Sequence, residues 1–494
     1  MITKTFSGGY SFKRFTGQVD NRILPSSIPP KIILPLSQGF GSPMPHIVKL
    51  GDRVKTGEII ARDDNRVCSP VHSSITGKVI SIEKRNYFNR EVTMVGIKSE
   101  GDDDFKKLEG YSAQWEQLPP EQIERLLYES GVTALDREGI PTRFKSSIIN
   151  SNEVEDLIVH GAMSEAYNMS LDVLLGGKSL FNFVEGIKIL KKIMPQARVH
   201  LALNVKNKSR IERVKKLTSN LSNFTIHPVV AKYPQGYDEV LVPSLLGKKF
   251  PYGYSAANIG IVVLNIQAVL LAFEAVVEGK VLIERTIALC GPAFKENFHI
   301  RTRVGTPLEF IVKKNLKSMP VRLVLNSLLT GPELKDLTLP VDKTFSQIVA
   351  IPENTERELL AFLRTGKEKD SYSRSFLSFF VKTQRKPETN FHGEQRPCIQ
   401  CGYCAEVCPV NIIPNMLYRY AKAGIHEVLM KYGIFNCIDC NLCSYVCPSK
   451  IPLSKNLKDT KSRLIESGCD HSLCILPKFN LKGLTEYKGV KTIR

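Results

Sequence analysis

The sequence contains no long hydrophobic run. No stretch of 18 or more consecutive apolar residues occurs, and the most apolar stretch, 261–277, is interrupted by Asn265, Gln267 and Glu274. A membrane-spanning helix needs about 20 mainly apolar residues, so we interpret 261–277 as a buried helix. The first residues, MITKTFSGGYSFKRF, also lack the apolar segment of a signal peptide. We therefore expect a soluble protein located in the cytoplasm.

The sequence has too few acidic residues to balance its basic ones. The formal net charge is +19 and the isoelectric point is near 9.3. Such a charge attracts polyanions, anionic membrane surfaces and acidic proteins. The basic residues are scattered, however, and aromatic residues do not alternate with them as in a nucleic-acid-binding motif. We therefore expect no nucleic-acid partner, and instead docking to a membrane complex or an acidic protein.

The length and composition allow several domains. At roughly 150 residues per domain, a chain of 494 residues suggests about three or four domains. The apolar fraction of 43% is ordinary for globular proteins. Each domain can therefore bury a core without crosslinks.

Residues 45–85 alternate apolar and polar side chains and are punctuated by glycine, which is typical of short strands with tight turns. The pattern is similar to the barrel-sandwich hybrid fold of biotinyl and lipoyl carrier domains. Those carriers present a lysine at an exposed hairpin tip, whereas the corresponding residues here, 71–75, read VHSSI. We therefore expect a structural module rather than a swinging-arm carrier.

Helices and strands alternate between about 120 and 235. Pro119 and Pro120 precede an amphipathic helix that Gly131 ends. The pattern then predicts strands at 156–160, 199–205 and 224–230, separated by helices at 178–193 and 210–221. This alternation indicates an α/β domain with a largely parallel sheet. Residues 284–312 return to β character, and a charged stretch at 364–395 leads to a cysteine-rich region.

Eight of the twelve cysteines fall between Cys398 and Cys447. They form two runs of the same pattern, Cys-x2-Cys-x2-Cys-x3-Cys-Pro, and clustered cysteines in a cytosolic protein favour metal over disulfides. Three thiolates with two residues between neighbours can bind three irons of one cubane, and the fourth cysteine reaches the other cluster. We therefore expect two [4Fe-4S] clusters, the first bound by Cys398, Cys401, Cys404 and Cys447, and the second by Cys437, Cys440, Cys443 and Cys408.

A pair of zinc sites is the alternative for these cysteines. Zinc usually needs only two cysteine pairs, so two complete four-cysteine runs favour iron–sulfur clusters. Residues 410–436, between the runs, have helical spacing and form a longer insertion than in small bacterial ferredoxins. This indicates a helical ferredoxin domain. The remaining cysteines fit no such pattern and are interpreted as buried or free thiols: Cys68, Cys290, Cys469 and Cys474.

Several segments resemble the C subunit of the Rnf electron-transport complex. They are Tyr233-Pro234-Gln235-Gly236, residues 263–274 and 279–291, GDRVKTGEIIA with SPVHSSITGKV, and the two cysteine runs. The sequence is also similar to the A subunit of the sodium-translocating NADH:quinone reductase in RTRVGTPLEF, SRSFL and NFHGEQRP. Members of that second family commonly lack the cluster cysteines, all of which are present here.

The resemblance implies a multidomain α/β and α+β fold. Its parts are a barrel-sandwich hybrid region at 1–110, an α/β domain like the flavin-binding subunit of complex I at 111–275, a β-grasp module at 276–355, a helical two-cluster ferredoxin domain at 375–465 and a basic tail at 466–494. The resemblance also implies a peripheral electron-transfer subunit of an ion-translocating oxidoreductase at the cytoplasmic side of the cell membrane. Its partners would be other subunits of that complex, with a ferredoxin or a flavin subunit as a further candidate.

One motif departs from the family pattern. Relatives that bind NADH and FMN carry a glycine-rich GxGGAGFPT loop, whose bare backbone approaches the flavin phosphate. The matching stretch, 134–142, reads ALDREGIPT, and the acidic motif that follows at 160–167 reads HGAMSEAY. We therefore expect this chain not to bind FMN and NADH itself. The remnants of the cofactor site would be Gly139, Thr142 and Glu165.

Two other functions compete with that of an electron-transfer subunit. The chain could be an NADH dehydrogenase subunit with its own FMN site, but the loss of glycines argues against this function. It could also be a largely structural docking subunit. Eight intact cysteines argue against that function, because clusters are costly to assemble.

Overall fold

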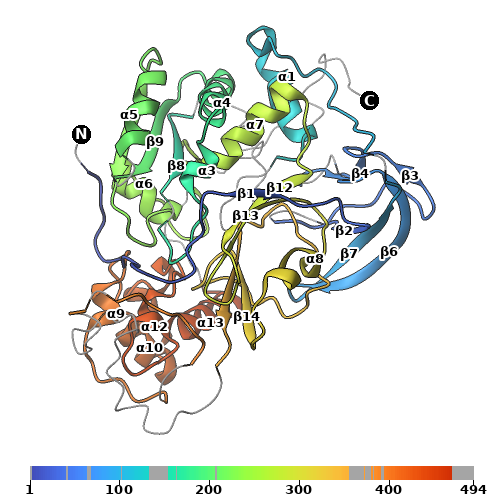
Figure 1. Cartoon of the computed structure of the whole chain (residues 1–494). Coiled ribbons are helices and arrows are strands. Elements are labelled where there is room, and N and C mark those ends of the chain that lie inside the picture. The colour runs from blue at the N-terminus through green and yellow to red at the C-terminus, as the bar shows by residue number, and fades with distance from the viewer. Residues whose placement is uncertain are drawn as a thin grey trace.

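The computed structural model describes residues 3–39, 43–63, 68–101, 103–132, 154–162, 164–205, 208–354, 372, 380–381, 383–390 and 394–469. Figure 1 shows an α/β domain above a helical domain that contains both cysteine runs, with two β modules to the right. Within these ranges, no helix is long and apolar enough to cross a membrane.

The first β module forms two small sheets. One has the strand order β2-β7-β6-β3, with β2 (Lys31–Pro35), β3 (Arg53–Val54), β6 (Gly77–Tyr87) and β7 (Arg90–Ser99). The other pairs β4 (Ile59–Ala61) with β5 (Val71–His72). Alternate side chains enclose a small core that includes Ile32, Leu34, Val79 and Ile97, as the period-two pattern of half-buried strands predicts. This is the predicted barrel-sandwich hybrid.

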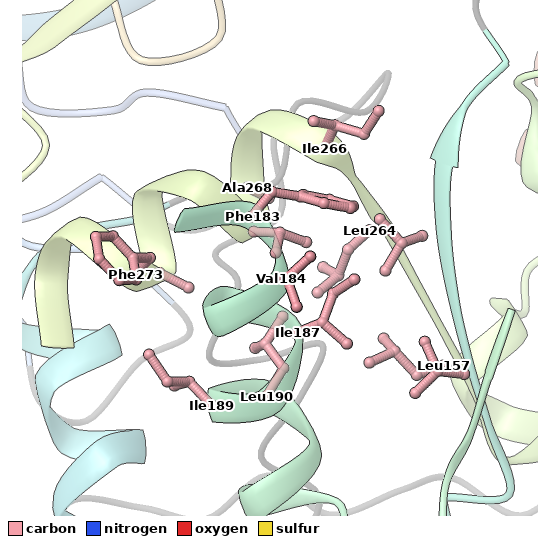
Figure 2. Packing of buried hydrophobic residues seen from close by; sticks show 14 of the residues in the cluster. Leu157, Phe183, Val184, Ile187, Ile189, Leu190, Leu264, Ile266, Ala268 and Phe273 are labelled. Atoms are coloured by element: carbon pink, nitrogen blue, oxygen red, sulfur yellow. The ribbon is translucent and has the colours of Figure 1, made fainter. Parts of the chain in front are cut away.

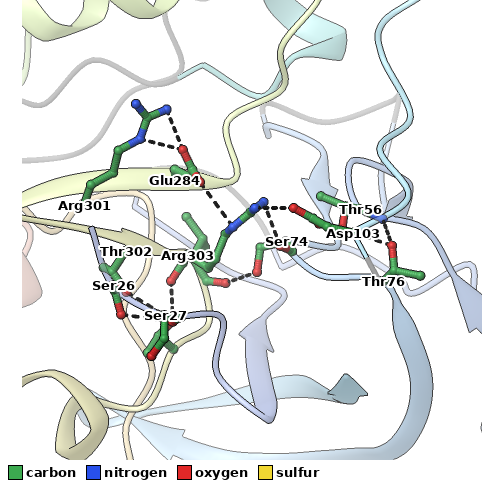
Figure 3. Close-up of polar contacts among 12 residues, drawn as sticks. Ser26, Ser27, Thr56, Ser74, Thr76, Asp103, Glu284, Arg301, Thr302 and Arg303 are labelled. Carbon is green, nitrogen blue, oxygen red and sulfur yellow. Dashed lines mark hydrogen bonds and ion pairs between the residues drawn. The ribbon is translucent and has the colours of Figure 1, made fainter. Parts of the chain in front are cut away.

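The hairpin tip that carries lysine in carrier domains is buried here. Ser73 and Ser74 are fully buried, and the Ser74 hydroxyl donates a hydrogen bond to the Val304 carbonyl. Arg303 of the neighbouring sheet donates to the Ser74 carbonyl at 3.2 Å and to the Asp103 carboxylate at 2.6 Å (Figure 3). The tip therefore forms a contact between two modules, which agrees with a structural role for this hairpin.

The α/β domain is built on a parallel sheet in the order β10-β9-β8-β11. The strands are β8 (Asp156–Gly161), β9 (Arg198–Asn204), β10 (Phe224–Val229) and β11 (Ile261–Asn265). One face is covered by α1 (Pro120–Glu129), α4 (Ser179–Ile193), α5 (Lys208–Leu217) and α7 (Ile266–Glu278), and the other by α6 (Asp238–Leu246). The short α3 (Leu171–Leu174) precedes α4.

Helix α4 supplies the centre of the main core. Phe183, Ile187 and Leu190 follow the spacing of a helical stripe, and they are almost fully buried against the sheet and α7. Figure 2 shows these side chains facing Leu157 of β8 and Leu264 of β11. Burial of each large apolar side chain contributes about 1.5–3 kcal/mol, so this stripe fixes α4 on the sheet.

The interpretation of 261–277 as one buried helix is wrong for its first five residues. Ile261–Asn265 form β11, because three consecutive β-branched residues favour a strand that is buried on both faces. The helix begins only after Asn265, whose side chain accepts a hydrogen bond from the Ala268 backbone at 2.8 Å. The asparagine that interrupts the apolar run is therefore the helix N-cap.

The second β module is a mixed five-stranded sheet in the order β1-β13-β12-β15-β14. The strands are β1 (Ile23–Pro25), β12 (Glu284–Cys290), β13 (Phe298–Arg303), β14 (Val321–Leu325) and β15 (Gln347–Pro352). The expected β character of 284–312 ends at Arg303. Leu308, Ile311 and Val312 are buried at helical spacing on α8 (Leu308–Val312), because a helical turn places all three on the core side.

The N-terminal segment, which we include in the expected barrel-sandwich region at 1–110, also pairs with other parts of the chain. Lys4 pairs with Val229 of β10, Tyr10 pairs with Tyr233, and β1 joins the edge strand β13. In Figure 1 this blue segment passes over the orange helical domain before it reaches β1. The segment is therefore held by backbone partners that lie hundreds of residues away in the sequence.

The last described domain is helical. It comprises α9 (Tyr403–Glu406), α10 (Pro414–Ala423), α11 (His426–Lys431), α12 (Leu442–Tyr445) and α13 (Leu453–Glu466). Leu417 and Leu429 of the predicted helical insertion are fully buried, and Leu457 of α13 packs with them. The predicted helical ferredoxin domain is therefore present.

Candidate functional site

The two cysteine runs have the same local backbone. In the first loop Gln400 and Gly402 have φ values of 54° and 80°, and in the second loop Asp439 and Asn441 have φ values of 55° and 64°. Each loop then enters a one-turn helix, α9 or α12. Left-handed residues bend a short chain sharply. The repeated bends therefore give the two loops equivalent turns around their cysteines.

The structure brings the cysteines together in two groups that mix the runs. Cys408 of the first run lines one small cavity with Cys437, Cys440 and Cys443 of the second run. In the other group, Cys404 interacts electrostatically with Cys401 and Cys447 and shares an apolar cluster with Cys398 and Cys447. The fourth cysteine of each run therefore lies with the first three cysteines of the other.

Burial disfavours the ionised form of these thiols. Burial, together with repulsion from neighbouring charges, raises the pKa of Cys404 and of Cys437 to about 11. These neighbours are Cys401 and Cys447 for Cys404, and Asp439 and Cys408 for Cys437. The pKa of Cys443 lies well above its usual range for the same reasons. Thiolates are the metal-binding form, so these groups need an occupant that supplies positive charge.

The two groups differ in exposure to solvent. Cys401 of the first loop is exposed, whereas its counterpart Cys440 in the second loop is buried. In the described part of the chain, no three His, Cys, Asp or Glu side chains form a site for a single metal ion. A four-iron cubane is held at separate corners by separate thiolates.

A pocket of about 630 Å³ opens where three domains meet. The α/β domain contributes His160, Glu165 and the 233–239 loop, the second β module contributes residues 325–332, and the helical domain contributes Asp439, Asn441, Ser454, Lys455 and Lys458. Ligand pockets in proteins measure about 300–1,000 Å³. The pocket is therefore large enough for a nucleotide-sized cofactor.

The pocket and the second cysteine group share a wall. Asn441 and Ser454 line both the pocket and the small cavity. Tyr233, which lines the pocket, donates a hydrogen bond to the Cys440 carbonyl at 2.9 Å and lies 2.8 Å from the Tyr237 hydroxyl. Burial, Tyr237 and Glu165 raise the pKa of Tyr233 far above its usual range, so Tyr233 stays a neutral donor.

Of the three residues predicted to remain from a cofactor site, the structure describes only Glu165. Gly139 and Thr142 lie outside the described residues. Glu165 is half-buried and lines the pocket. Sequence reasoning missed Tyr237, Lys455 and Lys458 as pocket residues, because they come from segments far apart in the sequence. The Tyr233-Pro234-Gln235-Gly236 motif was the available signal for this pocket wall.

Family models match three consecutive parts of the chain. The RnfC barrel sandwich hybrid domain matches residues 4–102, the Nuo51 FMN-binding domain matches residues 127–273, and the 4Fe-4S dicluster domain matches residues 397–451. The second match argues against our expectation that FMN is absent. The third agrees with two clusters.

Curated relatives align with most of this chain. The C subunit of the proton-translocating ferredoxin:NAD(+) oxidoreductase complex of Clostridium ljungdahlii is 26% identical over 84% of this chain and 84% of its own length. The sodium-translocating counterpart of Acetobacterium woodii is 25% identical, with 81% and 83% covered. The ion-translocating oxidoreductase C subunit of Pectobacterium carotovorum is 27% identical, and this chain spans only 54% of its length.

A solved NAD+-reducing [NiFe]-hydrogenase in the H2-reduced state is 12% identical with a TM-score of 0.42, over 72% of this chain and 63% of that chain. That likeness supports no functional argument. The domains and the two cysteine groups define a multidomain iron–sulfur protein of the dicluster ferredoxin class. The RnfC-type N-terminal domain, the Nuo51-type domain and the dicluster domain occur in this order, and the chain is similar over most of its length to C subunits of ion-translocating ferredoxin:NAD(+) oxidoreductase complexes.

Proposed function

We propose that this chain is the peripheral electron-transfer subunit of an ion-translocating ferredoxin:NAD+ oxidoreductase complex. The observation that carries the proposal is the grouping of eight cysteines into two mixed sets, one of which adjoins a large pocket. Bound [4Fe-4S] clusters supply one-electron transfer. The relatives in Clostridium and Acetobacterium are named as subunits of such complexes.

The two cysteine groups fit the predicted ligand sets. Cys398, Cys401, Cys404 and Cys447 would hold the first cluster, and Cys437, Cys440, Cys443 and Cys408 would hold the second. Buried thiols with raised pKa values become stable thiolates only when iron offsets their charge. Apolar residues such as Ile451 and Leu453 pack beside the first group and exclude water.

The pocket would hold a flavin mononucleotide. The Nuo51-type match covers the α/β wall of the pocket, and its volume suits a ligand of that size. Lys455 and Lys458 supply positive charge on the wall formed by the helical domain, where a phosphate would be stabilised by ionic hydrogen bonds. This proposal replaces our expectation that FMN is not bound, and it does not depend on residues 134–142.

The chain would associate with the cytoplasmic side of the cell membrane through other subunits. Its net charge of +19 favours contact with acidic partner proteins and anionic headgroups. A ferredoxin or a flavin-containing subunit would be suitable partners, because both exchange single electrons with iron–sulfur clusters.

Iron and sulfide content tests the proposal. Anaerobically purified protein should contain close to eight irons and eight acid-labile sulfides per chain, as two cubanes require. The Cys404→Ser variant should lose one cluster and keep most of the other, whereas Ser at Cys290, a buried cysteine outside both groups, should keep both. Two tightly bound zinc ions without broad visible absorbance would contradict the proposal.

A further inference from the structure

Lys461 of α13 is a buried lysine beside the second cysteine group. Its side chain is 3% exposed, and its Nζ donates hydrogen bonds to the Cys437 carbonyl at 2.9 Å and to the Asp439 carboxylate at 2.8 Å. Burying an ammonium group is costly unless it is paired and hydrogen-bonded. The position of Lys461 is therefore set by the second cysteine loop itself.

The first cysteine loop has no carboxylate at the corresponding position. Gln400 and Asp439 both stand between the first and second cysteines of their runs, with φ values of 54° and 55°. The same backbone turn therefore presents a neutral amide beside one group and a carboxylate beside the other. The Cys437 Sγ lies 3.6 Å from the Asp439 Oδ1, so this charge directly borders a proposed cluster ligand.

The α/β domain covers Lys461 from the opposite side. The Nζ of Lys461 lies 5.3 Å from the centroid of the Tyr252 ring, and that ring packs against Phe435 with centroids 5.2 Å apart. Aromatic faces attract ammonium groups. The two rings thus keep water away from the lysine, which strengthens its electrostatic interaction with neighbouring groups.

We propose that the charge of Lys461 raises the reduction potential of the second cluster, and that the charge of Asp439 lowers it. The inference rests on the proposed function, because it takes Cys437, Cys440, Cys443 and Cys408 as ligands of that cluster. Reduction adds one negative charge, so a nearby cation stabilises the reduced form and a nearby carboxylate destabilises it. The two clusters, held by repeated loops, are thereby given different potentials.

Potentiometric titration of the full chain, monitored by electron paramagnetic resonance, tests this inference. The Lys461→Met variant should make reduction of the second cluster at least tenfold less favourable, which is about 59 mV for a one-electron couple. The potential of the first cluster should not change. The Asp439→Asn variant should shift the second cluster in the opposite direction, and the double variant should lie close to the parent chain.

Control variants identify the source of the shift. Lys431→Met removes an exposed lysine from the same domain and should leave both potentials unchanged. Lys461→Arg keeps the charge and should keep the second potential near its original value. Comparison with the Cys404→Ser variant, which should retain only the second cluster, assigns each signal to its cluster.

Unchanged potentials in Lys461→Met, or equal shifts of both clusters, would overturn the inference. If Lys461→Met fails to bind the second cluster, the Asp439→Asn variant decides instead, and an unshifted potential there overturns it. The proposed function would fail in a different way, since the parent chain would then contain no iron and sulfide to titrate.

Discussion

Lys455 and Lys458 are two exposed lysines on α13 that line the pocket. If the pocket binds FMN as proposed, these residues are its nearest source of positive charge in the helical domain. A charge-assisted hydrogen bond to phosphate contributes about 1.5–3 kcal/mol. The double variant Lys455→Met/Lys458→Met should therefore weaken FMN binding about tenfold or more, measured by calorimetric titration.

Riboflavin provides the matched ligand for that measurement, because it lacks the phosphate. Its affinity should be the same for the parent chain and the double variant. An unchanged FMN affinity would show that other residues meet the phosphate. If the parent chain binds neither ligand, the flavin proposal itself is wrong.

His227 gives the α/β domain a pH-dependent stability. Burial lowers the pKa of His227 to about 4, with further contributions from His200 and Lys4, and its Nε2 lies 3.0 Å from the His200 Nδ1. His200 in turn contacts the Asp156 carboxylate. An unfolded histidine titrates near pH 6.5. Between about pH 6.5 and 4 the unfolded chain therefore binds more protons, and stability falls as the pH decreases.

Replacing this histidine should reduce that pH dependence. The His227→Gln variant should lose less of its unfolding free energy than the parent chain when the pH is lowered from about 7.5 to 5, measured by urea unfolding. His426→Gln alters an exposed histidine and serves as the control. If the unfolding free energy falls equally with pH in the parent chain and in the His227 variant, the lowered pKa of His227 is contradicted.

At the scale of whole elements, the N-terminal segment and the first cysteine run are in close contact. Gly8 has a φ of +68°, and a Cβ added there would lie 2.4 Å from the Cys408 carbonyl oxygen. The adjacent Gly9 backbone donates to the Val407 carbonyl at 2.8 Å. Any side chain at residue 8 would therefore push the segment away from a proposed ligand of the second cluster.

The Gly8→Ala variant should destabilise the helical domain by about 1–3 kcal/mol, the usual cost of overpacking a close contact. Thermal bleaching of the cluster absorbance should occur at a lower temperature than in the parent chain. Gly424→Ala is a matched control, since Gly424 has a φ of +70° with no atom within 4 Å of the added Cβ. Equal effects of both variants would attribute the loss to backbone strain alone.

The elements that sequence reasoning predicted are those with strong local patterns. The strands predicted at 156–160 and 224–230 agree with β8 and β10 within one residue. The apolar residues that form each strand are close together in the sequence, so the local pattern is enough to predict them. The cysteine spacing likewise indicated the dicluster domain. The route of residues 3–25 and the pocket could not be predicted, because both depend on contacts such as that between Tyr10 and Tyr233, which no local pattern encodes.

At the scale of the whole molecule, the excess of basic residues bears on how the chain is held at a membrane. If charge dominates the proposed attachment, washing native membranes at about 1 M salt should release the protein, because the Debye length falls to about 3 Å from about 10 Å at 0.1 M. Immunoblotting of the pellet and supernatant measures this. Retention at high salt would indicate hydrophobic subunit contacts, and a fully soluble protein in low-salt lysate would contradict the membrane-complex assignment.

The backbone contact between Gly9 and Val407 also constrains the order of events during biosynthesis. Ribosomes add about 5–20 residues per second, so the N-terminal segment waits tens of seconds before its partner in the cysteine run has been made. In the first part of that interval, before residues 233 and 298–303 have been made, the Tyr10 backbone has no Tyr233 and β1 has no β13. Nascent chains stalled before β10 (Phe224–Val229) has been made should accordingly leave this segment open to proteases, because Val229, Tyr233 and β13 are then all missing.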